Sequence, residues 1–574
     1  MVICVIFWRK TTTMQRKPTE LSDTVFDLAI VGGGITGACL AADAARRGLS
    51  VALVEKGDFG AATSSASSKL LHGGIRYLQQ LKFRKVRESA LERLYFQNLA
   101  PHLTRLVPFV IPTFKSFSKS RLVLRAAMTG YEALCTGQNR IVEDPSRRVH
   151  RGRMLSEQEL AAIVPGLSVP GLTGGIAFNE IHMHSSERMT LAFLETADSL
   201  GAVLVNYATA ERFLGTETGR VTGVRVRDVL SKELFDLRAE QVINAAGPWI
   251  PVLNKGIGAR QSVRSLVNAY SKGAHLVTRS LTRDHAVALP TRKQTQAVIN
   301  RGGRHVFIIP WRNHSLIGTT YGPYQGDLDA VSATEDDVQQ MMDDINSALG
   351  AEVLQRRDVV HAFAGLYPLT DKVINPNVYQ GTGSYQVIDH AVTDGLPGLV
   401  SVFGAKYTTA RLLAEKTLDM FQDRFDKPLD RCRMRELPLL AGDIDDITGY
   451  REAKKCQYQG ALHEATVDHL VSNYGTGIDA LVELLETDPA LGQILAPGLP
   501  VLAAEAVHAA RNEMACHLDD FVFRRSGLGT LGNPGRDALH KAARLMAVEL
   551  GWNQQRIDQE VSQTYGHFLS RETS

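Results

Sequence analysis

Three glycines near the N-terminus have the spacing of a phosphate-binding loop. They are Gly32, Gly34 and Gly37, in the pattern Gly-x-Gly-x-x-Gly. Gly32 permits a tight turn, Gly34 lets a pyrophosphate group approach the backbone, and Gly37 allows a helix to pack closely on a strand. Unpaired N–H groups at the start of that helix favour a bound anion. The loop is therefore predicted to bind the phosphates of a dinucleotide.

The elements that must position this loop are present on both sides of it. An apolar run at residues 28–31 predicts a buried strand, and the alanine-rich stretch 38–47 predicts the helix. A second strand is expected at 50–54 and ends at Glu55, whose carboxylate can accept hydrogen bonds from ribose hydroxyls. An acid at this point favours an unphosphorylated ribose. The unit predicts a Rossmann-like domain that binds NAD or FAD rather than NADP.

A hydroxyl-rich segment, residues 62–78, follows this unit with the sequence ATSSASSKLLHGGIRYL. Its threonine and serines can donate hydrogen bonds to phosphate oxygens, and its His-Gly-Gly triplet lets backbone pass close to a flat ring. The same composition is typical of a flexible surface loop, so the segment alone leaves both interpretations open. The residues expected to contact a cofactor here are Thr63, Ser64, Ser65, His72, Gly73 and Gly74.

Residues 62–78 resemble the flavin-contacting segment of the FAD-dependent glycerol-3-phosphate dehydrogenases. Further matches follow in the order of that family, with VINAAGPW at 242–249, KGAH at 272–275, IGTT at 317–320 and SVFGAKYTTAR at 401–411. The resemblance covers about residues 25 to 555. It implies that FAD is the cofactor, and that its further contacts include Ala246, Gly247, Gly404, Lys406 and Thr408.

The resemblance also implies a reaction. Hydride would leave a secondary alcohol carbon of sn-glycerol 3-phosphate for the flavin, giving dihydroxyacetone phosphate, and the electrons would pass on to a quinone. His275 would be the base, because imidazole titrates near the working pH, and Lys406 would place positive charge at the pyrimidine edge of the flavin. The implied catalytic residues are His275, Arg76, Tyr77 and Lys406, and the implied substrate contacts are Arg76, Tyr77, Thr319 and Tyr367.

Two positions depart from the family pattern where a phosphate group would be bound. The family has Gly-Val-Arg-Pro where this chain has Tyr367 between Leu366 and Pro368, and a second family arginine aligns with Ser384. Each charge-assisted arginine–phosphate contact contributes about 1.5 to 3 kcal/mol, so loss of both would weaken phosphate binding by roughly a hundredfold or more. Cations that could replace them are Arg76, Lys406, Arg301, Arg304 and Arg312.

Two other functions stay open, and the first of them follows from this departure. The chain could be a flavin oxidase or dehydrogenase that acts on a different polyol or an amine. The second alternative belongs to another class: the chain could be an FAD-bearing RNA-modification or sensor protein. The formal net charge of +3 and the lack of a basic stripe with interleaved aromatic residues argue against nucleic-acid binding.

The length of 574 residues is enough for two or three domains. The fold class expected is α/β, in which a Rossmann-like FAD-binding domain is interleaved with an α+β substrate domain and followed by an all-helical C-terminal domain. The predicted bounds are a disordered tail at 1–22, the FAD-binding domain at 23–100, 196–270 and 395–430, the substrate domain at 101–195 and 271–394, and the helical domain at 435–574.

The remaining features bear on the setting of the protein. The six cysteines are far apart, and His182-x-His184 lacks a third ligand, so we predict neither a disulfide framework nor a metal site. No run approaches 18 apolar residues, and a cytoplasmic location is expected. Residues 114–134 alternate basic and apolar side chains, which indicates either peripheral contact with the cytoplasmic membrane face or a solvated face of a core helix. A homodimer stays open.

Overall fold

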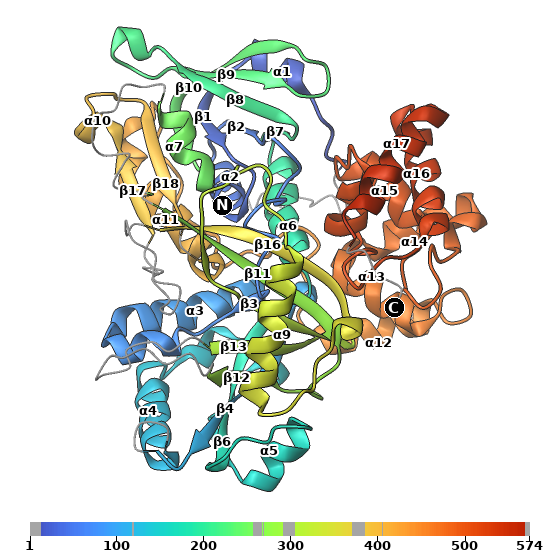
Figure 1. Cartoon of the computed structure of the whole chain (residues 1–574). Coiled ribbons are helices and arrows are strands. Elements are labelled where there is room, and N and C mark those ends of the chain that lie inside the picture. The colour runs from blue at the N-terminus through green and yellow to red at the C-terminus, as the bar shows by residue number, and fades with distance from the viewer. Residues whose placement is uncertain are drawn as a thin grey trace.

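The computed structural model describes residues 13–116, 120–255, 267, 269–290, 305–369, 385–404 and 406–568, with the side chains of Arg76, Gln79 and Gln80 left aside. Figure 1 shows two sheets, one above the other, and a helical unit beside them. This arrangement confirms the expected fold class, because a mixed α/β body is followed by an all-helical C-terminal part.

The first sheet has a parallel centre, in which β10, β1, β2 and β7 lie side by side and β18 extends the parallel pairing from β10. Strands β1, β2 and β18 are almost continuously apolar, as expected where both faces of a parallel sheet are covered. Antiparallel β8, β9 and β17 complete the sheet. The bounds are β1 (Val25–Val31), β2 (Val51–Val54), β7 (Val203–Val205), β8 (Ala208–Leu214), β9 (Gly223–Asp228), β10 (Leu234–Asn244), β17 (Gln386–Asp389) and β18 (Leu399–Phe403).

Helix α2 (Ile35–Arg46) is the central helix of this domain. Its alanines pack in one core with residues from α6 (Ser186–Ser199) and α11 (Ala410–Phe421). Helix α3 (Phe83–Leu99) adds Leu94 and Phe96 to the same core. The small side chains of α2 let these helices approach closely, and the close packing fixes the end of α2 that follows the glycine loop.

The second sheet is mostly antiparallel, and it runs in the order β15-β11-β14-β13-β12-β4-β6-β3, with β16 paired to β11 and β5 paired to β6. Helices α4 (Arg121–Leu134), α5 (Glu157–Ile163) and α9 (Glu335–Leu349) accompany it. The bounds are β3 (Leu70–Leu71), β4 (Thr104–Phe114), β5 (Arg153–Leu155), β6 (Leu172–Met183), β11 (Ala269–Arg279), β12 (Ala286–Pro290), β13 (His305–Trp311), β14 (His314–Gly318), β15 (Gly322–Tyr324) and β16 (Val359–Leu369).

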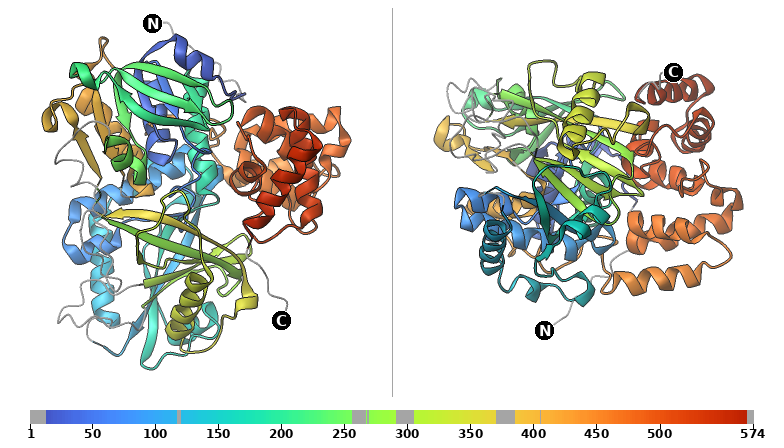
Figure 2. Two further views of the ribbon diagram at one scale, coloured as in Figure 1. Left: turned by 45° about the horizontal axis from the view of Figure 1, so that its top comes forward. Right: turned by 60° about the horizontal axis from the view of Figure 1, so that its bottom comes forward.

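The C-terminal part is a bundle with its own apolar core (Figure 2). Helix α16 follows Gly535 and ends at Gly551, whose left-handed conformation is a common helix terminator. The helices are α12 (Ile447–Gln457), α13 (Glu464–Tyr474), α14 (Ile478–Thr487), α15 (Ala503–Asn512), α16 (Arg536–Leu550) and α17 (Gln554–Gly566), with a π-helical turn, η14, at Asp520–Arg525.

The prediction of a disordered tail over residues 1–22 is wrong for the part that the structure describes. Met14 is 1% exposed, and its N–H donates to Asn512 O at 3.0 Å. Arg16 forms an ion pair with Asp228, and helix α1 (Pro18–Asp23) buries Leu21. The partners of these residues lie hundreds of positions away, so the local composition could not reveal them.

Two elements also lie on a different side of the predicted domain bounds. Strand β3 falls within 23–100 but pairs with β6 in the second sheet. Helix α6 begins within 101–195 but packs on α2 in the first domain. The segment from residue 62 to 78 therefore passes from one domain to the other.

Candidate functional site

The glycine loop has the geometry of a dinucleotide-binding turn. Gly32 has φ +110°, and a Cβ there would lie 2.7 Å from the carbonyl oxygen of Ala245. A Cβ on Gly37 would lie 1.8 Å from the carbonyl oxygen of Gly32. Gly34 precedes α2 and has no side-chain cap on the helix. The loop thus leaves the positive end of a twelve-residue helix available to an anion.

Glu55 lies beside this loop at the end of β2. Its Oε2 accepts a hydrogen bond from Gly33 N at 2.7 Å, and its Oε1 accepts one from Gly57 N at 2.9 Å. Burial raises the pKa of the Glu55 carboxyl, although the two N–H donors favour its charged form. The carboxylate is therefore held in place at the loop, where an acceptor for ribose hydroxyls was predicted.

The carboxyl ends of neighbouring parallel strands bring the other predicted contacts to the same edge. Ala245 N donates to Val31 O at 2.8 Å, so the turn that holds Ala246 and Gly247 starts beside the glycine loop. At the end of β18, a Cβ on Gly404 would lie 2.6 Å from Thr36 Oγ1, and Thr408 is buried in the following turn. Ligands of open α/β sheets bind at such an edge, so the residues described here fit FAD.

The hydroxyl groups of the hydroxyl-rich segment have two kinds of partner: one lies at this edge of the sheet, and others are bonded to backbone carbonyl groups. Ser64 Oγ accepts a hydrogen bond from Ile35 N at 2.9 Å, at the start of α2. Ser65 Oγ donates to Ala62 O at 2.9 Å, and Thr63 Oγ1 donates to Leu366 O at 2.9 Å. Ser64 is therefore placed at the helix end, whereas the hydroxyls of Thr63 and Ser65 already serve local structure.

The His72-Gly73-Gly74 triplet is held by two buried side chains, Glu180 and Tyr131, that the sequence did not indicate. Gly73 N donates to Glu180 Oε2 at 2.7 Å, and Glu180 is paired with the buried Arg93. A Cβ on Gly73 would lie 2.0 Å from the hydroxyl oxygen of Tyr131. Gly73 is thus required for packing against α3 and α4, a reason that differs from contact with a flat ring.

His275 lies on β11 in a nearly closed environment. Its Nε2 is 3.0 Å from Ser68 Oγ, and its ring stacks on Phe363 at 5.1 Å between centroids. Burial lowers the pKa of His275 to about 3, and the charge of Lys69 contributes. The expectation that this imidazole titrates near the working pH does not hold in this structure, because the neutral form predominates there.

Lys406 and Tyr77 face each other where the two domains meet. The Nζ of Lys406 lies 3.8 Å from the centroid of the Tyr77 ring. Burial, together with the charge of Lys85, lowers the pKa of Lys406 to about 7. A lysine with this pKa changes charge within the physiological range, unlike an ordinary solvated lysine.

We expect substitution of Lys406 to change the pH dependence of flavin reduction. In the natural protein the rate should fall as the pH rises through about 7, because the ammonium group loses its proton there. Lys406→Met should lower the rate roughly 10²- to 10³-fold, the effect of removing one preorganised charge or donor. Lys406→Arg should stay charged at all pH values and abolish this pH limb. Stopped-flow flavin absorbance between pH 5.5 and 9 measures both; a limb that persists in the methionine variant would contradict the assignment.

Two of the predicted substrate contacts, Thr319 and Tyr367, lie on or next to strands that pair with β11, the strand of His275. Thr319 Oγ1 donates to Ala274 O at 3.2 Å, and Tyr367 on β16 is paired with Ser271 on β11. The main chain of Arg76 lies in a 3-10 turn, Ile75–Gln80, and its side chain is outside the described residues. Arg301, Arg304 and Ser384 also lie outside them.

Arg312 is another cation that could replace the missing arginines, but its guanidinium group contacts other residues. Its Nη2 is 3.0 Å from His184 Nε2, and its Nη1 donates to Thr530 Oγ1 at 3.3 Å. Burial lowers the pKa of Arg312 to about 10. The side chain therefore ties the β13–β14 hairpin to the C-terminal bundle.

A buried ion pair under the site was not predicted from the sequence. Lys69 Nζ lies 2.7 Å from both carboxylate oxygens of Glu187, and 5.8 Å from the centroid of Phe363, on which His275 stacks. Lys69 belongs to residues 62–78, but a lysine between serines and leucines gives no local signal of burial. Its partner is 118 positions away.

Membrane spans and metal clusters are both absent from the described residues. None of their helices is both long and apolar enough to cross a membrane. Within those same residues, no group of three histidine, cysteine, aspartate or glutamate side chains is arranged to hold a metal ion.

Comparison with known proteins agrees with this geometry. Residues 27–416 match the family described as FAD dependent oxidoreductase, and residues 432–557 match the C-terminal domain of alpha-glycerophosphate oxidase. A glycerol-3-phosphate dehydrogenase from Synechocystis is 31% identical over 96% of this chain and 98% of its own length. Glycerol-3-phosphate dehydrogenase 2 from Mycobacterium tuberculosis is 33% identical over 95% of this chain and 88% of its own length.

A solved structure shows the same fold. The glycerol-3-phosphate dehydrogenase from Bacillus halodurans, complexed with FAD, is 26% identical, has a TM-score of 0.73, and is matched over 96% of this chain and 95% of its own. These relatives favour neither the polyol or amine oxidase nor the RNA-modification alternative. The chain belongs to the FAD-dependent oxidoreductases and, among them, to the glycerol-3-phosphate dehydrogenase family.

Proposed function

We propose that this enzyme oxidises sn-glycerol 3-phosphate to dihydroxyacetone phosphate and passes the electrons through FAD to a quinone. The observation that carries the proposal is the position of residues 62–78. Within this one segment Tyr77 contacts Lys406 of the FAD-binding domain, and Ser68 contacts His275 of the second sheet. The family's catalytic candidates are thereby brought to one boundary between the domains. The named relatives supply the substrate.

The residues of this boundary have distinct tasks in the proposal. FAD, when bound, supplies the acceptor for hydride. Burial keeps His275 neutral, and in the tautomer with its proton on Nδ1 the Nε2 atom accepts a hydrogen bond from Ser68 and can accept the hydroxyl proton of the substrate. The Phe363 ring stacks on the imidazole and holds it in position. Lys406 supplies positive charge near the reacting groups.

Anaerobic mixing of the purified flavoprotein with glycerol 3-phosphate tests this function. Rapid loss of the flavin absorbance is expected, with glycerol as a matched substrate that lacks the phosphate and reacts far more slowly. A flavin that dithionite bleaches but glycerol 3-phosphate does not would reject the substrate. Reoxidation by a water-soluble quinone, without stoichiometric peroxide when oxygen is present, is expected for the proposed acceptor.

Tyr367 provides a test of how the phosphate group is held. It occupies the position of a family arginine on β16, next to the strand that carries His275. We expect Tyr367→Arg to lower the KM for glycerol 3-phosphate roughly tenfold or more, because an arginine–phosphate contact contributes about 1.5 to 3 kcal/mol. Tyr367→Phe is the matched control: it adds no cation and should not lower the KM. An arginine variant with unchanged KM would show that other residues already fill this place.

We also propose that the enzyme works in the cytoplasm and touches the cytoplasmic membrane face through α4. Leu122 on this helix is 80% exposed. Arg121 Nη1 donates to Leu155 O at 2.9 Å and Arg125 Nη1 donates to Gly152 O at 2.9 Å, so part of the basic face serves packing. Leu122→Ser should therefore reduce sedimentation with phosphatidylcholine–phosphatidylglycerol vesicles without changing turnover; equal sedimentation would reject this contact.

A further inference from the structure

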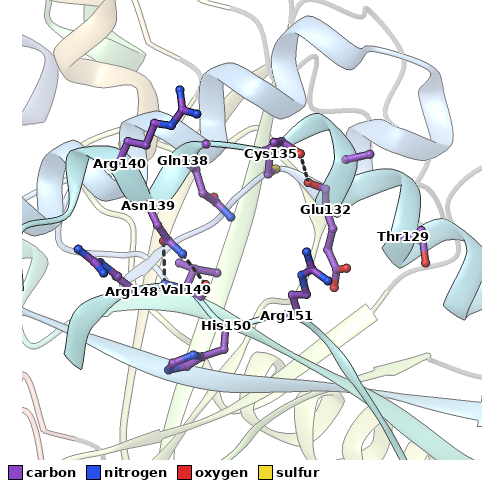
Figure 3. Close-up of a pocket in the computed structure, with 13 residues that line it drawn as sticks. Thr129, Glu132, Cys135, Gln138, Asn139, Arg140, Arg148, Val149, His150 and Arg151 are labelled. Atoms are coloured by element: carbon purple, nitrogen blue, oxygen red, sulfur yellow. Dashed lines mark hydrogen bonds between the residues drawn. The ribbon is translucent and has the colours of Figure 1, made fainter. Parts of the chain in front are cut away.

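A cavity of about 730 Å³ lies in the second domain, and its lining residues are different from those of the flavin site. One wall is formed by the end of α4 and the following 3-10 turn, Gln138–Ile141, and the other by residues 148–151. Figure 3 shows Arg148, His150 and Arg151 on the second wall and Gln138 and Arg140 on the first. Nothing in the reaction proposed above uses this cavity.

The charge of the cavity is unbalanced. Three guanidinium groups, those of Arg140, Arg148 and Arg151, line it together with one carboxylate, Glu132. That carboxylate accepts a hydrogen bond from Gly152 N at 2.7 Å, so it already has a backbone partner. None of the three arginines forms an ion pair with a carboxylate within the ranges that the structure describes. The three arginines are exposed where they line this open cavity, and Arg148 Nε donates to Val142 O at 3.4 Å. Three guanidinium groups against one carboxylate leave the lining with an excess of positive charge, which favours an anion.

The two walls are joined by a pair of hydrogen bonds. Asn139 Nδ2 donates to Val149 O at 2.8 Å, and Val149 N donates to Asn139 Oδ1 at 3.0 Å (Figure 3). This two-way contact fixes the spacing between the turn and residues 148–151. A site whose walls are held in this way loses less conformational entropy when a ligand binds.

We propose that this cavity binds the phosphate ester of a ligand other than the substrate. Guanidinium groups form paired hydrogen bonds with phosphate oxygens, and several of them in one concave site are typical of phosphate recognition. The volume lies within the range of small-molecule sites. The side-chain NH2 of Gln138 can donate a hydrogen bond to the rest of the ligand. The hydroxyl oxygens of Thr129 and Thr136, whose protons are donated to backbone carbonyl groups, can accept one.

The site is connected to the flavin segment by a short series of buried contacts. Gln138, which lines the cavity, accepts a hydrogen bond from Arg93 Nη2 at 3.1 Å. Arg93 pairs with Glu180, and Glu180 accepts a hydrogen bond from Gly73 N at 2.7 Å. A ligand that moves Gln138 therefore acts on the segment next to the flavin, and its binding should perturb the flavin absorbance spectrum.

Calorimetric titration of the FAD-loaded enzyme with inorganic pyrophosphate tests the site. We expect saturable binding that the double variant Arg148→Gln/Arg151→Gln weakens roughly a hundredfold, because removal of each guanidinium group should weaken binding about tenfold or more. Arg357→Gln, which changes an exposed arginine of the same domain, is the matched control and should bind as the natural protein does. Flavin content and the circular dichroism spectrum show that each variant is folded.

A second set of titrations, with lipid vesicles, distinguishes a soluble phosphate ester from a lipid headgroup. Pyrophosphate binding without vesicles supports a soluble ligand. Binding that requires phosphatidylglycerol in phosphatidylcholine vesicles, and that the double arginine variant abolishes, supports a lipid headgroup. Binding that is equal in the double variant, or absent with both probes, overturns the proposal. Because binding is measured directly, these outcomes are independent of whether glycerol 3-phosphate is the substrate.

Discussion

Replacement of Gly37 by alanine is expected to yield a protein without bound flavin. The new methyl carbon would lie 1.8 Å from the carbonyl oxygen of Gly32, which is backbone and cannot move without opening the loop. Helix α2 would have to shift away from β1, and its N-terminal amides would lose the position at which they can bind the pyrophosphate. The expected loss of affinity is therefore close to complete, because one substitution changes every contact of the loop.

The flavin-to-protein absorbance ratio after gel filtration measures this effect. Gly130→Ala is the matched control: it is also a helical glycine, but a Cβ there meets no atom within 4 Å among the described residues. That variant should keep its flavin and gain about 0.5 to 1 kcal/mol of stability from the higher helix propensity of alanine. If Gly37→Ala bound FAD as tightly as Gly130→Ala, the glycine loop would not be the pyrophosphate site.

Replacement of Arg525 by methionine is expected to lower the free energy of unfolding by about 3 to 5 kcal/mol. Asp58 is buried between two arginines of the C-terminal bundle and accepts hydrogen bonds from Arg525 Nη1 at 2.7 Å and Arg524 Nε at 2.6 Å. Burial raises the pKa of Asp58, but Arg525 and Arg524 outweigh it and hold the pKa well below its usual range. Without Arg525 the carboxylate loses its bidentate partner in a place that water does not reach.

Chemical denaturation followed by circular dichroism measures this loss. The matched control is Arg511→Met, which breaks the partly exposed pair of Arg511 with Glu549 and should cost about 1 kcal/mol or less. The double variant Asp58→Asn/Arg525→Met should recover part of the stability, since it leaves no unpaired charge. Equal effects of Arg525→Met and Arg511→Met would show that the Asp58 contact is solvated.

The part of the molecule that the sequence predicts well is the part built from local patterns. The glycine loop, the apolar strands around it and Glu55 lie within 30 residues of one another, so the position of each element restricts the position of the next. Their spacing was enough to predict the parallel centre of the first sheet and a dinucleotide cofactor, and the resemblance of residues 62–78 identified that cofactor as FAD. The catalytic assignments of His275, Tyr77 and Lys406 stay proposals, although the structure brings their segments together.

The features that the sequence did not predict depend on distant partners. Lys69 meets Glu187 across 118 positions, and Asp58 meets Arg525 across 467. The burial that lowers the pKa of His275 arises from strands far along the chain. Met14 and Arg16 also have remote partners, which is why a disordered tail was expected where the described residues from 13 onward are ordered.

The passage of residues 62–78 between the two sheets has an evolutionary consequence. Ser64 adjoins the start of α2, and Leu70 and Leu71 of the same segment extend the sheet that holds His275. We expect that changes in that sheet selected for a new substrate will also shift Ser64 and Tyr77, which belong to the same segment. We therefore expect substrate preference and redox behaviour to change together in this family, and substitutions in β6 should covary with substitutions in residues 62–78.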